Sequence, residues 1–120
     1  MADVTREVSL IRQMFARIDS GDWPALSGLF AADVTYHRPG YPPFAGREAV
    51  LHFYEHVRMI ASGTHRLESV IADGAEAACW GRFHGVSRDG TSIDIEFAEG
   101  YRFRDGKLAE RKSFFFLPGV

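Results

Sequence analysis

The first half of the chain repeats apolar residues every three or four positions, which is the spacing of a helix with one buried face. In the opening segment these residues are Val4, Val8, Ile11, Phe15 and Ile18. The pattern predicts a helix over residues 3–20, followed by a short helix that Asp22 caps and that ends near Ala31. The same spacing in residues 46–61 predicts a third helix, with Gly63 as its C-terminal cap.

The second half of the chain alternates apolar and polar positions, which is typical of strands buried on one face. Asp-Gly recurs at residues 73–74, 89–90 and 105–106, and between alternating segments this dipeptide is a strong hairpin signal. Three such turns predict four antiparallel strands, at residues 65–72, 75–87, 91–103 and 107–116. Three glycines inside them are expected at bulges or bends, namely Gly81, Gly85 and Gly100.

A shorter strand is expected at residues 33–37, before a stiff proline-rich loop at residues 39–43. Helices followed by a long meander predict an α+β fold, in which a strongly curved antiparallel sheet wraps around the N-terminal helices. The 120 residues match the size of one domain, so we expect a single domain over residues 1–120.

The segment 91–103 indicates which side chains face the interior. Its apolar face consists of Thr91, Ile93, Ile95, Phe97, Glu99, Tyr101 and Phe103. Glu99 is the only charged residue on this face, so its carboxylate is expected to point toward the core. A buried carboxylate costs free energy unless it is paired, hydrogen-bonded or placed beside a wet cavity, and this requirement makes Glu99 a candidate site residue.

The preceding strand is expected to add further polar groups to the interior. A two-residue turn at residues 89–90 places Trp80, Arg82 and His84 on the same face as Glu99, and a count across residues 73–74 adds His65. The cluster has two interpretations. It is either a buried ion pair between Glu99 and Arg82, or the wall of a ligand pocket in which Glu99 exchanges protons with His84 as its partner. The inward face of residues 107–116 stays open, because both faces mix charged and aromatic residues.

Charge and composition narrow the function. Lys and Arg number 14 against 16 Asp and Glu, and this net charge of −2 argues against nucleic acid or membrane surfaces as partners. Cys79 is the only cysteine, which excludes an internal disulfide, is typical of a cytoplasmic protein, and is expected on the sheet face away from the pocket. No segment has the length and apolar character of a signal peptide or a membrane span.

Two histidines deserve a separate test as metal ligands. His52 and His56 lie four residues apart, as zinc ligands on one helix can, but the sequence HFYEH differs from H-E-x-x-H because Glu55 does not follow the first histidine. Both histidines project opposite the apolar side of the predicted helix. We therefore expect them in solvent, and we expect no metal site.

Two segments combine a strand before a proline, a helix start and a strand leading into a turn: FAADVTYHRPGYPPFAGREAVLHFYEH and EGYRFRDGKLAERKSFFF. Through these features nearly the whole chain resembles the nuclear-transport-factor-2-like superfamily, in particular its SnoaL-like and ketosteroid-isomerase-like branches. The resemblance implies a cone-shaped, cystatin-like fold that is usually a dimer.

The resemblance also bears on the site. Ketosteroid isomerases use an Asp base, a Tyr and a protonated acid. Glu99 falls at the position of that acid, but Arg38, preceded by His37, falls at the base and Met14 near the Tyr. Steroid isomerisation by that mechanism is therefore not expected, and neither is the carboxylate pair of limonene-epoxide-hydrolase-like relatives. SnoaL-like polyketide cyclases, which this chain resembles more loosely, carry out cofactor-free acid–base chemistry with a His and a carboxylate.

These observations lead to a functional expectation. We expect a cofactor-independent acid–base isomerase, cyclase or dehydratase acting on a small, mostly apolar oxygenated molecule of polyketide, steroid or terpenoid type. The candidate catalytic residues are Glu99, His84, Arg38 and Tyr36. The candidate substrate-binding residues are Arg82, His37, His65, Phe53, Tyr54, Trp80, Phe97 and Met14. Which of residues 36–38 point inward is left open, with Tyr36 or Arg38 favoured by the alignment.

Two alternative functions and a homodimer are also considered. The domain could instead be a non-catalytic ligand-binding or accessory domain, or a structural module whose interior is filled. A homodimer is expected through the outer face of the sheet, where Ala77, Cys79, Gly81 and Phe83 are predicted to lie among charged residues.

Overall fold

The N-terminal helix follows the predicted pattern. The computed structural model describes residues 5–116, so residues 3 and 4 of the predicted helix lie outside the described residues. Helix α1 (Arg6–Ser20) begins after Thr5, whose hydroxyl accepts a hydrogen bond from a backbone N–H of the first turn at 3.2 Å. It ends at Gly21, which adopts a left-handed conformation with φ 70° and caps the last carbonyls.

The second helix is shorter than predicted. Helix α2 (Trp23–Ser27) is capped by Asp22 as expected, but it ends before Ala31. The chain extends from Phe30 onwards because Phe30 pairs with Leu108 of the last strand. The first strand is correspondingly longer than the predicted segment 33–37.

The third helix also differs from its prediction over residues 46–61. Helix α3 (Arg47–His52) continues into a π-helical turn, η1 (Phe53–Val57), which closes when the N–H of Arg58 donates to the carbonyl of Phe53 at 2.8 Å. The prediction of Gly63 as a cap was wrong, because a strand begins at Ile60 and includes Gly63. The missing side chain of Gly63 leaves room for the ring of Phe83 on the neighbouring strand.

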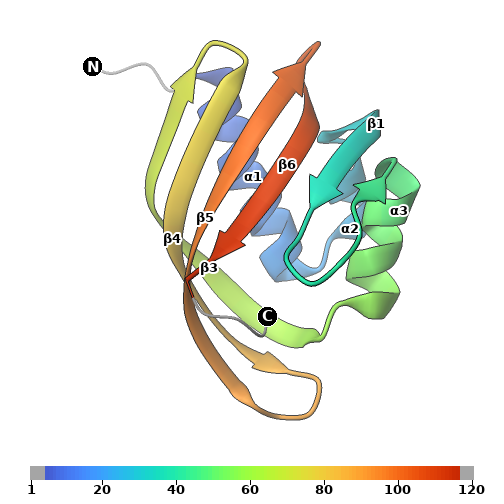
Figure 1. Cartoon of the computed structure of the whole chain (residues 1–120), viewed down its shortest axis with the longest axis vertical. Coiled ribbons are helices and arrows are strands. Elements are labelled where there is room, and N and C mark those ends of the chain that lie inside the picture. The colour runs from blue at the N-terminus through green and yellow to red at the C-terminus, as the bar shows by residue number, and fades with distance from the viewer. Residues whose placement is uncertain (1–4, 117–120) are drawn as a thin grey trace.

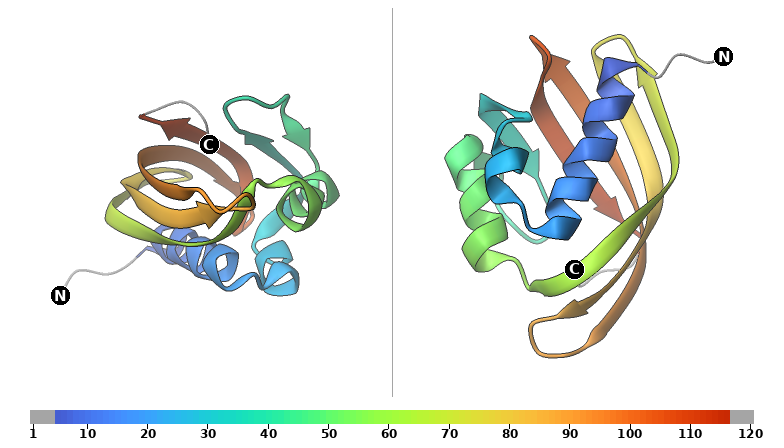
Figure 2. Two further views of the ribbon diagram at one scale, coloured as in Figure 1. Left: turned by 90° about the horizontal axis from the view of Figure 1, so that it is seen from below. Right: turned by 180° about the vertical axis from the view of Figure 1, so that it is seen from behind.

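One curved sheet contains all six strands: β1 (Phe30–His37), β2 (Phe44–Ala45), β3 (Ile60–Asp73), β4 (Glu76–Ser87), β5 (Ser92–Arg104) and β6 (Lys107–Phe115). Their order is β2-β1-β6-β5-β4-β3, and the pairing is antiparallel except between β1 and β6, which run parallel. The helices lie on the concave side of the sheet (Figures 1 and 2). The predicted α+β fold with a curved sheet around N-terminal helices is confirmed.

The first and third Asp-Gly motifs each form a two-residue turn. The turn begins at the Asp in the third motif but at the Gly in the first. At residues 105–106 both residues have positive φ, 52° and 74°, and form the turn themselves. At the first motif the turn lies one residue later, over residues 74–75, because Asp73 still pairs with Glu76. The same dipeptide therefore gives two different registers.

The second Asp-Gly motif forms a longer loop and changes the register of β4 against β5. Three residues, 88–90, form this loop, and the N–H of Ser87 donates to the carbonyl of Thr91 at 2.9 Å. Cys79, and not Trp80, consequently pairs with Glu99. This one-residue difference from the predicted turn reverses which side chains of β4 face the helices.

The core lies between the concave face of the sheet and the helices. Its largest fully buried side chains come from α1, α2, β1, α3, η1 and β4, and are Ile11, Met14, Leu26, Phe30, Val34, Tyr36, Val50, Phe53 and Cys79. Within residues 5–116, no helix is long and apolar enough to cross a membrane.

Candidate functional site

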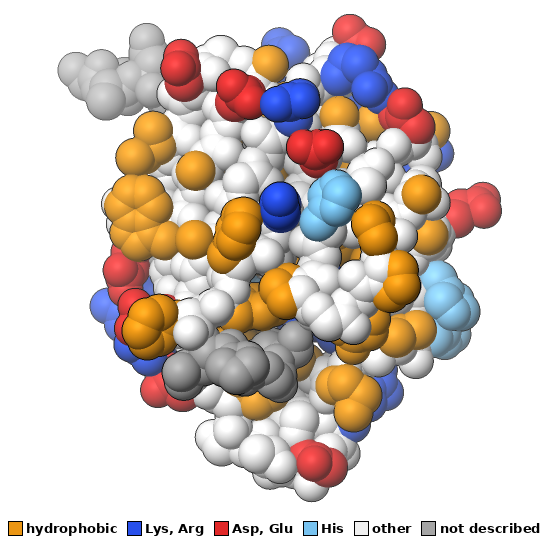
Figure 3. Space-filling view, viewed as in Figure 1, with side chains coloured by type: hydrophobic (Ala, Val, Ile, Leu, Met, Phe, Trp, Pro, Cys, Tyr) orange, Lys and Arg blue, Asp and Glu red, His pale blue; other side chains and the backbone are white. Residues whose placement is uncertain are grey.

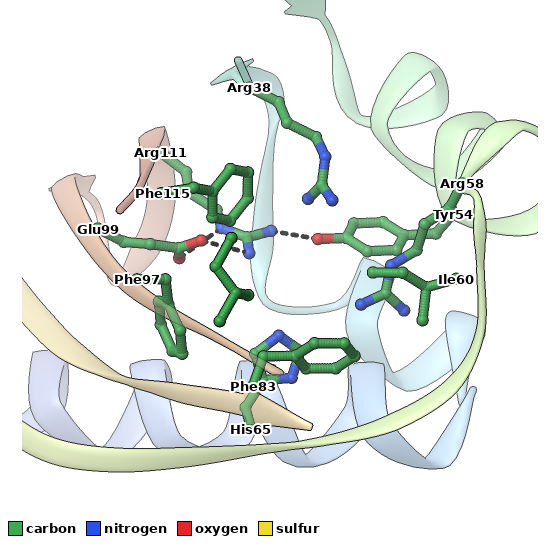
Figure 4. Close-up of a pocket in the computed structure, with 11 residues that line it drawn as sticks. Arg38, Tyr54, Arg58, Ile60, His65, Phe83, Phe97, Glu99, Arg111 and Phe115 are labelled. Carbon is green, nitrogen blue, oxygen red and sulfur yellow. Dashed lines mark hydrogen bonds and ion pairs between the residues drawn. The ribbon is translucent and has the colours of Figure 1, made fainter. Parts of the chain in front are cut away.

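A small cavity lies in the concave interior where β3–β6 face η1 (Figure 4). It measures about 20 Å³, counted as the space open to the centre of a water-sized sphere. This is enough for one small polar group or a water molecule. The lining residues are Arg38, Tyr54, Arg58, Ile60, His65, Phe83, Ile95, Phe97, Glu99, Arg111 and Phe115.

Glu99 is a buried carboxylate whose oxygens are fully hydrogen-bonded. Its Oε1 accepts from Tyr101 at 2.6 Å and from Nε of Arg111 at 2.8 Å. Its Oε2 accepts from Nη2 of Arg111 at 2.8 Å and from the hydroxyl of Ser113 at 2.5 Å. Burial alone would raise the pKa of Glu99, but Arg111 and the two hydroxyl donors hold this pKa below its usual range, so the group is ionised at neutral pH.

A chain of hydrogen bonds links the first strand to Glu99. Nη1 of Arg38 donates to the hydroxyl of Tyr36 at 3.0 Å, and that hydroxyl lies 2.8 Å from the hydroxyl of Ser113. Because Ser113 donates its only hydroxyl proton to Glu99, Tyr36 must donate to Ser113. Burial raises the pKa of Tyr36, which therefore stays neutral.

Arg111 holds the centre of this network in place. Besides its two bonds to Glu99, its Nη1 donates to the hydroxyl of Tyr54 at 2.5 Å, and its guanidinium carbon lies 4.3 Å from the ring centroid of Tyr36. Tyr54 lines the cavity and keeps its own hydroxyl proton available, because no acceptor for it is found among the residues described.

His65 forms the second titratable centre of the cavity wall. Its Nδ1 lies 2.5 Å from Oδ1 of Asp19 on α1, and its backbone N–H donates to the other oxygen of Asp19 at 2.9 Å. Burial lowers the pKa of His65, and the contact with Asp19 opposes this effect only in part. A neutral imidazole that donates from Nδ1 to Asp19 has its lone pair on Nε2, the nitrogen that is free to act as a base.

Arg38 and Arg58 are the two remaining cations of the cavity wall. They are only 7% and 8% exposed, and the Nε atom of each is buried without a hydrogen-bond partner. Aromatic rings flank both groups: Phe53 and Phe115 lie beside Arg38, and Tyr54 and Phe83 beside Arg58. Burial lowers the pKa of Arg58, as expected for a cation without a carboxylate beside it.

The structure also shows which residues of the first strand point inward and which of the other predicted residues line the cavity. Tyr36 and Arg38 point inward, whereas His37 lies on the other face of β1 and is only half-buried. Three further predicted residues are buried, but only one of them, Phe97, lines the cavity. Phe53 packs behind Arg38, and Met14 belongs to the core.

Three predicted site residues of β4 lie outside the cavity. Arg82, His84 and Trp80 face solvent on the outer side of the sheet, and Arg82 pairs there with Asp94 and Glu96. The inward placement predicted for them was wrong, because the loop at residues 88–90 has three residues and not two. The buried ion-pair interpretation had the wrong arginine, since Glu99 pairs with Arg111 and not with Arg82.

The same register change reverses the other residues of β4. Cys79 and Phe83, predicted on the outer face, are buried inside, and Gly81 pairs with Phe97 on the inner face. The sulfur of Cys79 lies 3.3 Å from the hydroxyl of Tyr101, which itself donates to Glu99. Burial raises the pKa of Cys79 to about 12, so this thiol is protonated.

Sequence reasoning missed three charged residues of the site, namely Arg111, Arg58 and Asp19. Arg111 lies beyond a bulge in β6, which breaks the alternation between Leu108 and residues 111–115 and conceals the inward face. Asp19 had a detectable signal, because it lies four residues after Phe15 and thus on the buried side of α1.

The two histidines of the third helix are not part of the cavity. His52 and His56 are exposed, with ring centroids 5.0 Å apart. Across residues 5–116, no three His, Cys, Asp or Glu side chains come together in a way that could hold a metal ion.

Comparison with known proteins places the chain in a family. The family profile described as a SnoaL-like domain matches residues 11–111, and this confirms the resemblance seen in the sequence. No curated protein matches the chain.

Solved structures share the fold at low sequence identity. An NTF2-like protein of unknown function from Burkholderia pseudomallei is 20% identical, with 93% of this chain and 92% of that chain covered and a TM-score of 0.86. A candidate SnoaL-like polyketide cyclase from Jannaschia sp. is 14% identical, with 97% and 92% covered and a TM-score of 0.82. An LEH-like epoxide hydrolase from M. tuberculosis is 11% identical, with 95% and 85% covered and a TM-score of 0.82.

Proposed function

The chain belongs to the SnoaL-like domain family, and we propose that it catalyses a cofactor-independent acid–base reaction in the cavity beside Glu99. The reaction class is isomerisation, cyclisation or dehydration of a small oxygenated molecule. All three can begin when a base removes a proton from a carbon next to a carbonyl group and the resulting enolate is stabilised. Support comes from two structural neighbours with the same fold, of which one is named a candidate SnoaL-like polyketide cyclase and the other an LEH-like epoxide hydrolase.

The observation that carries the proposal is the contact between His65, which lines the cavity, and Asp19 behind it. Asp19 fixes the imidazole orientation and keeps the proton on Nδ1, so Nε2 can accept a proton from the substrate. The lowered pKa of His65 keeps the imidazole in the neutral, basic form at pH 7. His65 is therefore assigned the role of general base, and Asp19 is a positioning residue.

The negative charge that develops on the substrate oxygen needs hydrogen-bond donors. Tyr54 can donate its hydroxyl proton, and the guanidinium groups of Arg38 and Arg58 lie in the same wall (Figure 4). Donors that are held in place before the reaction stabilise an oxyanion efficiently, since they need no rearrangement in the transition state. Proton transfer to His65 and stabilisation by these donors together account for both halves of enolate formation.

Glu99 takes a different role from the acid or base proposed from sequence. Its four acceptor positions are occupied by Tyr101, Arg111 and Ser113, so it has no lone pair free for a substrate proton. Glu99 acts as a positioning residue for Arg111, and Arg111 in turn holds the hydroxyl of Tyr54. Tyr36 is a further positioning residue of the same hydrogen-bond network.

Hydrogen–deuterium exchange tests this proposal without knowledge of the substrate. A panel of small ketones, keto acids, β-dicarbonyl compounds and polyketide-like lactones is incubated with the protein in D₂O, and deuterium uptake next to the carbonyl is measured by mass spectrometry. We expect deuterium uptake on at least one compound class, and we expect His65→Gln to abolish it. The control is His52→Gln, which changes an exposed histidine on α3 and should retain the uptake. Uptake that is equal in His65→Gln and wild type would contradict the proposal. Binding of a panel compound with no uptake would favour the non-catalytic alternative.

We also propose that the outer face of the sheet pairs with a second copy of the chain. Trp80, Ala98 and Phe114 form one row across β4, β5 and β6, and Trp80 and Phe114 are 42% and 52% exposed. Phe116 beside this row is 79% exposed. Hydrophobic side chains gather on this face of the molecule (Figure 3). Such a row is costly in water, and a two-fold axis through it would bury it against itself.

A further inference from the structure

We infer that the cavity binds the carboxylate group of its ligand between Arg38 and Arg58. This inference deepens the proposed function, because it names the substrate class of the same site: a small carboxylic acid, and not a neutral apolar metabolite.

The wall of the cavity holds three guanidinium groups but a single carboxylate. The cations are Arg38, Arg58 and Arg111, and the carboxylate is Glu99. Both oxygens of Glu99 bind Arg111, so this pair is complete. Asp19, behind the cavity wall, is in turn bound to His65. Two positive charges of the wall are left without a carboxylate.

Neither of these two arginines forms an ion pair with any of the residues that the structure describes, and each has an orphaned Nε. Within residues 5–116, the only hydrogen bond from either guanidinium is the one from Nη1 of Arg38 to the hydroxyl of Tyr36, and the flanking rings attract the cations without replacing a counter-ion. A buried cation in this state is destabilising on its own. Such an arrangement is expected where the missing counter-ion arrives with a ligand.

The geometry favours a carboxylate over a larger anion. Figure 4 shows the guanidinium ends of Arg38 and Arg58 turned into the cavity from two sides. A guanidinium presents its donors as a planar fork that matches the two oxygens of a carboxylate. The cavity of about 20 Å³ requires the group that enters it to be small.

The rest of the ligand has a place beside the cavity. A groove of about 330 Å³ runs along the end of α1, η1 and the start of β3, and it shares Tyr54, Arg58 and Ile60 with the cavity. Arg58 therefore stands where the two spaces meet. A ligand can place its carboxylate inside, against Arg38 and Arg58, while its body occupies the groove.

The groove limits how many negative charges the ligand carries. Beyond Arg58 its charged side chains are Asp19, Glu55 and Arg88, so the groove offers no excess of positive charge to a second anionic group. The guanidinium of Arg88 is moreover engaged, since its Nε donates to the carbonyl of Arg58 at 2.6 Å. The charges of the whole site match a monocarboxylic acid.

Matched pairs of acids and amides test the inference. Acetate, benzoate, phenylacetate and cinnamate are each compared with the corresponding primary amide, and inorganic phosphate is added as a further anion. The shift in Tm is measured for each, because a ligand that binds only the folded state raises Tm. We expect at least one carboxylate to raise Tm by several degrees, its amide to have no effect and phosphate to have none. Equal shifts for acids and amides, or no shift with any acid, would overturn the inference, and a shift with phosphate alone would overturn its carboxylate assignment.

Variants then locate the binding. Arg58→Met and Arg38→Met should each abolish the shift, whereas Arg82→Gln, which changes an arginine on the outer face, should retain it. Arg58→Met should also raise the Tm of the ligand-free protein, since it removes an unpaired buried charge. Unchanged carboxylate binding in Arg58→Met would overturn the inference.

The test separates this inference from the proposed function. His65→Gln should keep the carboxylate-dependent shift and lose deuterium exchange. If wild type binds carboxylates but exchanges no deuterium, the catalytic proposal fails and the ligand class stands. If exchange occurs on neutral ketones and no carboxylate binds, the ligand class fails and the catalytic proposal stands.

Discussion

Glu99 and Arg111 form a two-pronged ion pair in the interior, in which both carboxylate oxygens accept from the guanidinium at 2.8 Å. The pair joins neighbouring strands β5 and β6 on their concave face. Breaking one partner of a buried pair is more costly than replacing both, because the remaining charge loses its counter-ion.

Glu99→Gln should therefore destabilise the fold strongly. Loss of the charge opposite Arg111 is expected to cost about 3–5 kcal/mol of unfolding free energy. For a domain of this size we expect Tm to fall by on the order of 10 °C. Differential scanning calorimetry measures the change, with Glu96→Gln on the outer face as the matched control, for which little change is expected. The double variant Glu99→Gln/Arg111→Met should recover much of the loss, and a double variant as unstable as the single one would contradict this account.

The pH dependence of catalysis should follow His65. Burial lowers the pKa of His65 below about 6.5, the ordinary value for histidine, so the base is neutral at pH 7 and is lost only as pH falls through the lowered pKa. Deuterium exchange should stay constant from pH 8 to about 6.5 and fall below that. Asp19→Asn removes the group that favours the protonated ring and should move this fall to still lower pH. A fall in the exchange rate that already begins above pH 7 would contradict this account, because it would mean that His65 is protonated in the folded protein at neutral pH.

The same shifts set the acid stability of the fold. Below about pH 6.5 the unfolded chain binds a proton at His65 that the folded chain does not, so stability declines as pH falls toward the lowered pKa. Glu99 adds a second loss below about pH 4.5, since its folded pKa is also depressed. Urea unfolding at pH 7.5, 5.5 and 4 should show a stepwise decline, and the first step should be smaller in His65→Gln.

Gly81 should not tolerate a side chain. A Cβ at this position would overlap with the backbone carbonyl of Arg66 on β3, close to the register shift between Leu67 and Ser69. Gly81→Ala is expected to destabilise by about 1–3 kcal/mol, because backbone has to move to admit the methyl group. Gly100→Ala is the matched control, since nothing lies within 4 Å of its Cβ. Equal unfolding free energies for the two variants would show that β3 and β4 are less tightly apposed than described.

The thiol of Cys79 should report global unfolding. It is fully buried and its pKa is raised to about 12, so almost no thiolate is present at pH 8. Because it is the only cysteine, the rate of alkylation by iodoacetamide measures a single site. We expect negligible reaction in native buffer and rapid reaction in 6 M urea, with the midpoint matching that of circular dichroism. Rapid alkylation of the native protein would indicate local opening of β4.

The dimer proposal is tested by mass in solution. Phe114 lies in the exposed row on the outer face, so Phe114→Glu should shift the species seen by sedimentation velocity from dimer to monomer. Gln13→Glu, at an exposed position on α1 away from the outer face of the sheet, introduces the same charge and is the control, which should remain dimeric. A wild-type chain that sediments as a monomer at high micromolar concentration would rule out this interface.

Much of the fold could be predicted because periodicity reports burial directly. The alternation of residues 91–103 correctly placed Glu99 toward the helices, and the end of the first helix at residue 20 and the cap at Asp22 were also predicted correctly. The parallel pairing of β1 with β6 and the short strand β2 left no comparable signal, since they depend on contacts between distant segments.

The site was harder to predict because it depends on register. Asp-Gly correctly marked three turns, but the dipeptide does not determine how many residues the turn contains. A one-residue error in the second turn exchanged Phe83 for His84 at the inner face, while a bulge in β6 concealed Arg111. His65 was placed correctly in the interior even so, because the bulge after Leu67 shifts β3 against β4.

The loop at residues 88–90 gives this protein an unusual sensitivity to changes in chain length. Deleting one residue there, such as Arg88, would favour a shorter hairpin in which Trp80, Arg82 and His84 turn toward the helices and Cys79 and Phe83 turn toward water. The deletion would leave every side chain of β4 intact and still dismantle the interior. Natural variants of this domain should consequently keep the number of residues in this loop constant, and Gly90, whose φ is 89°, should remain a glycine.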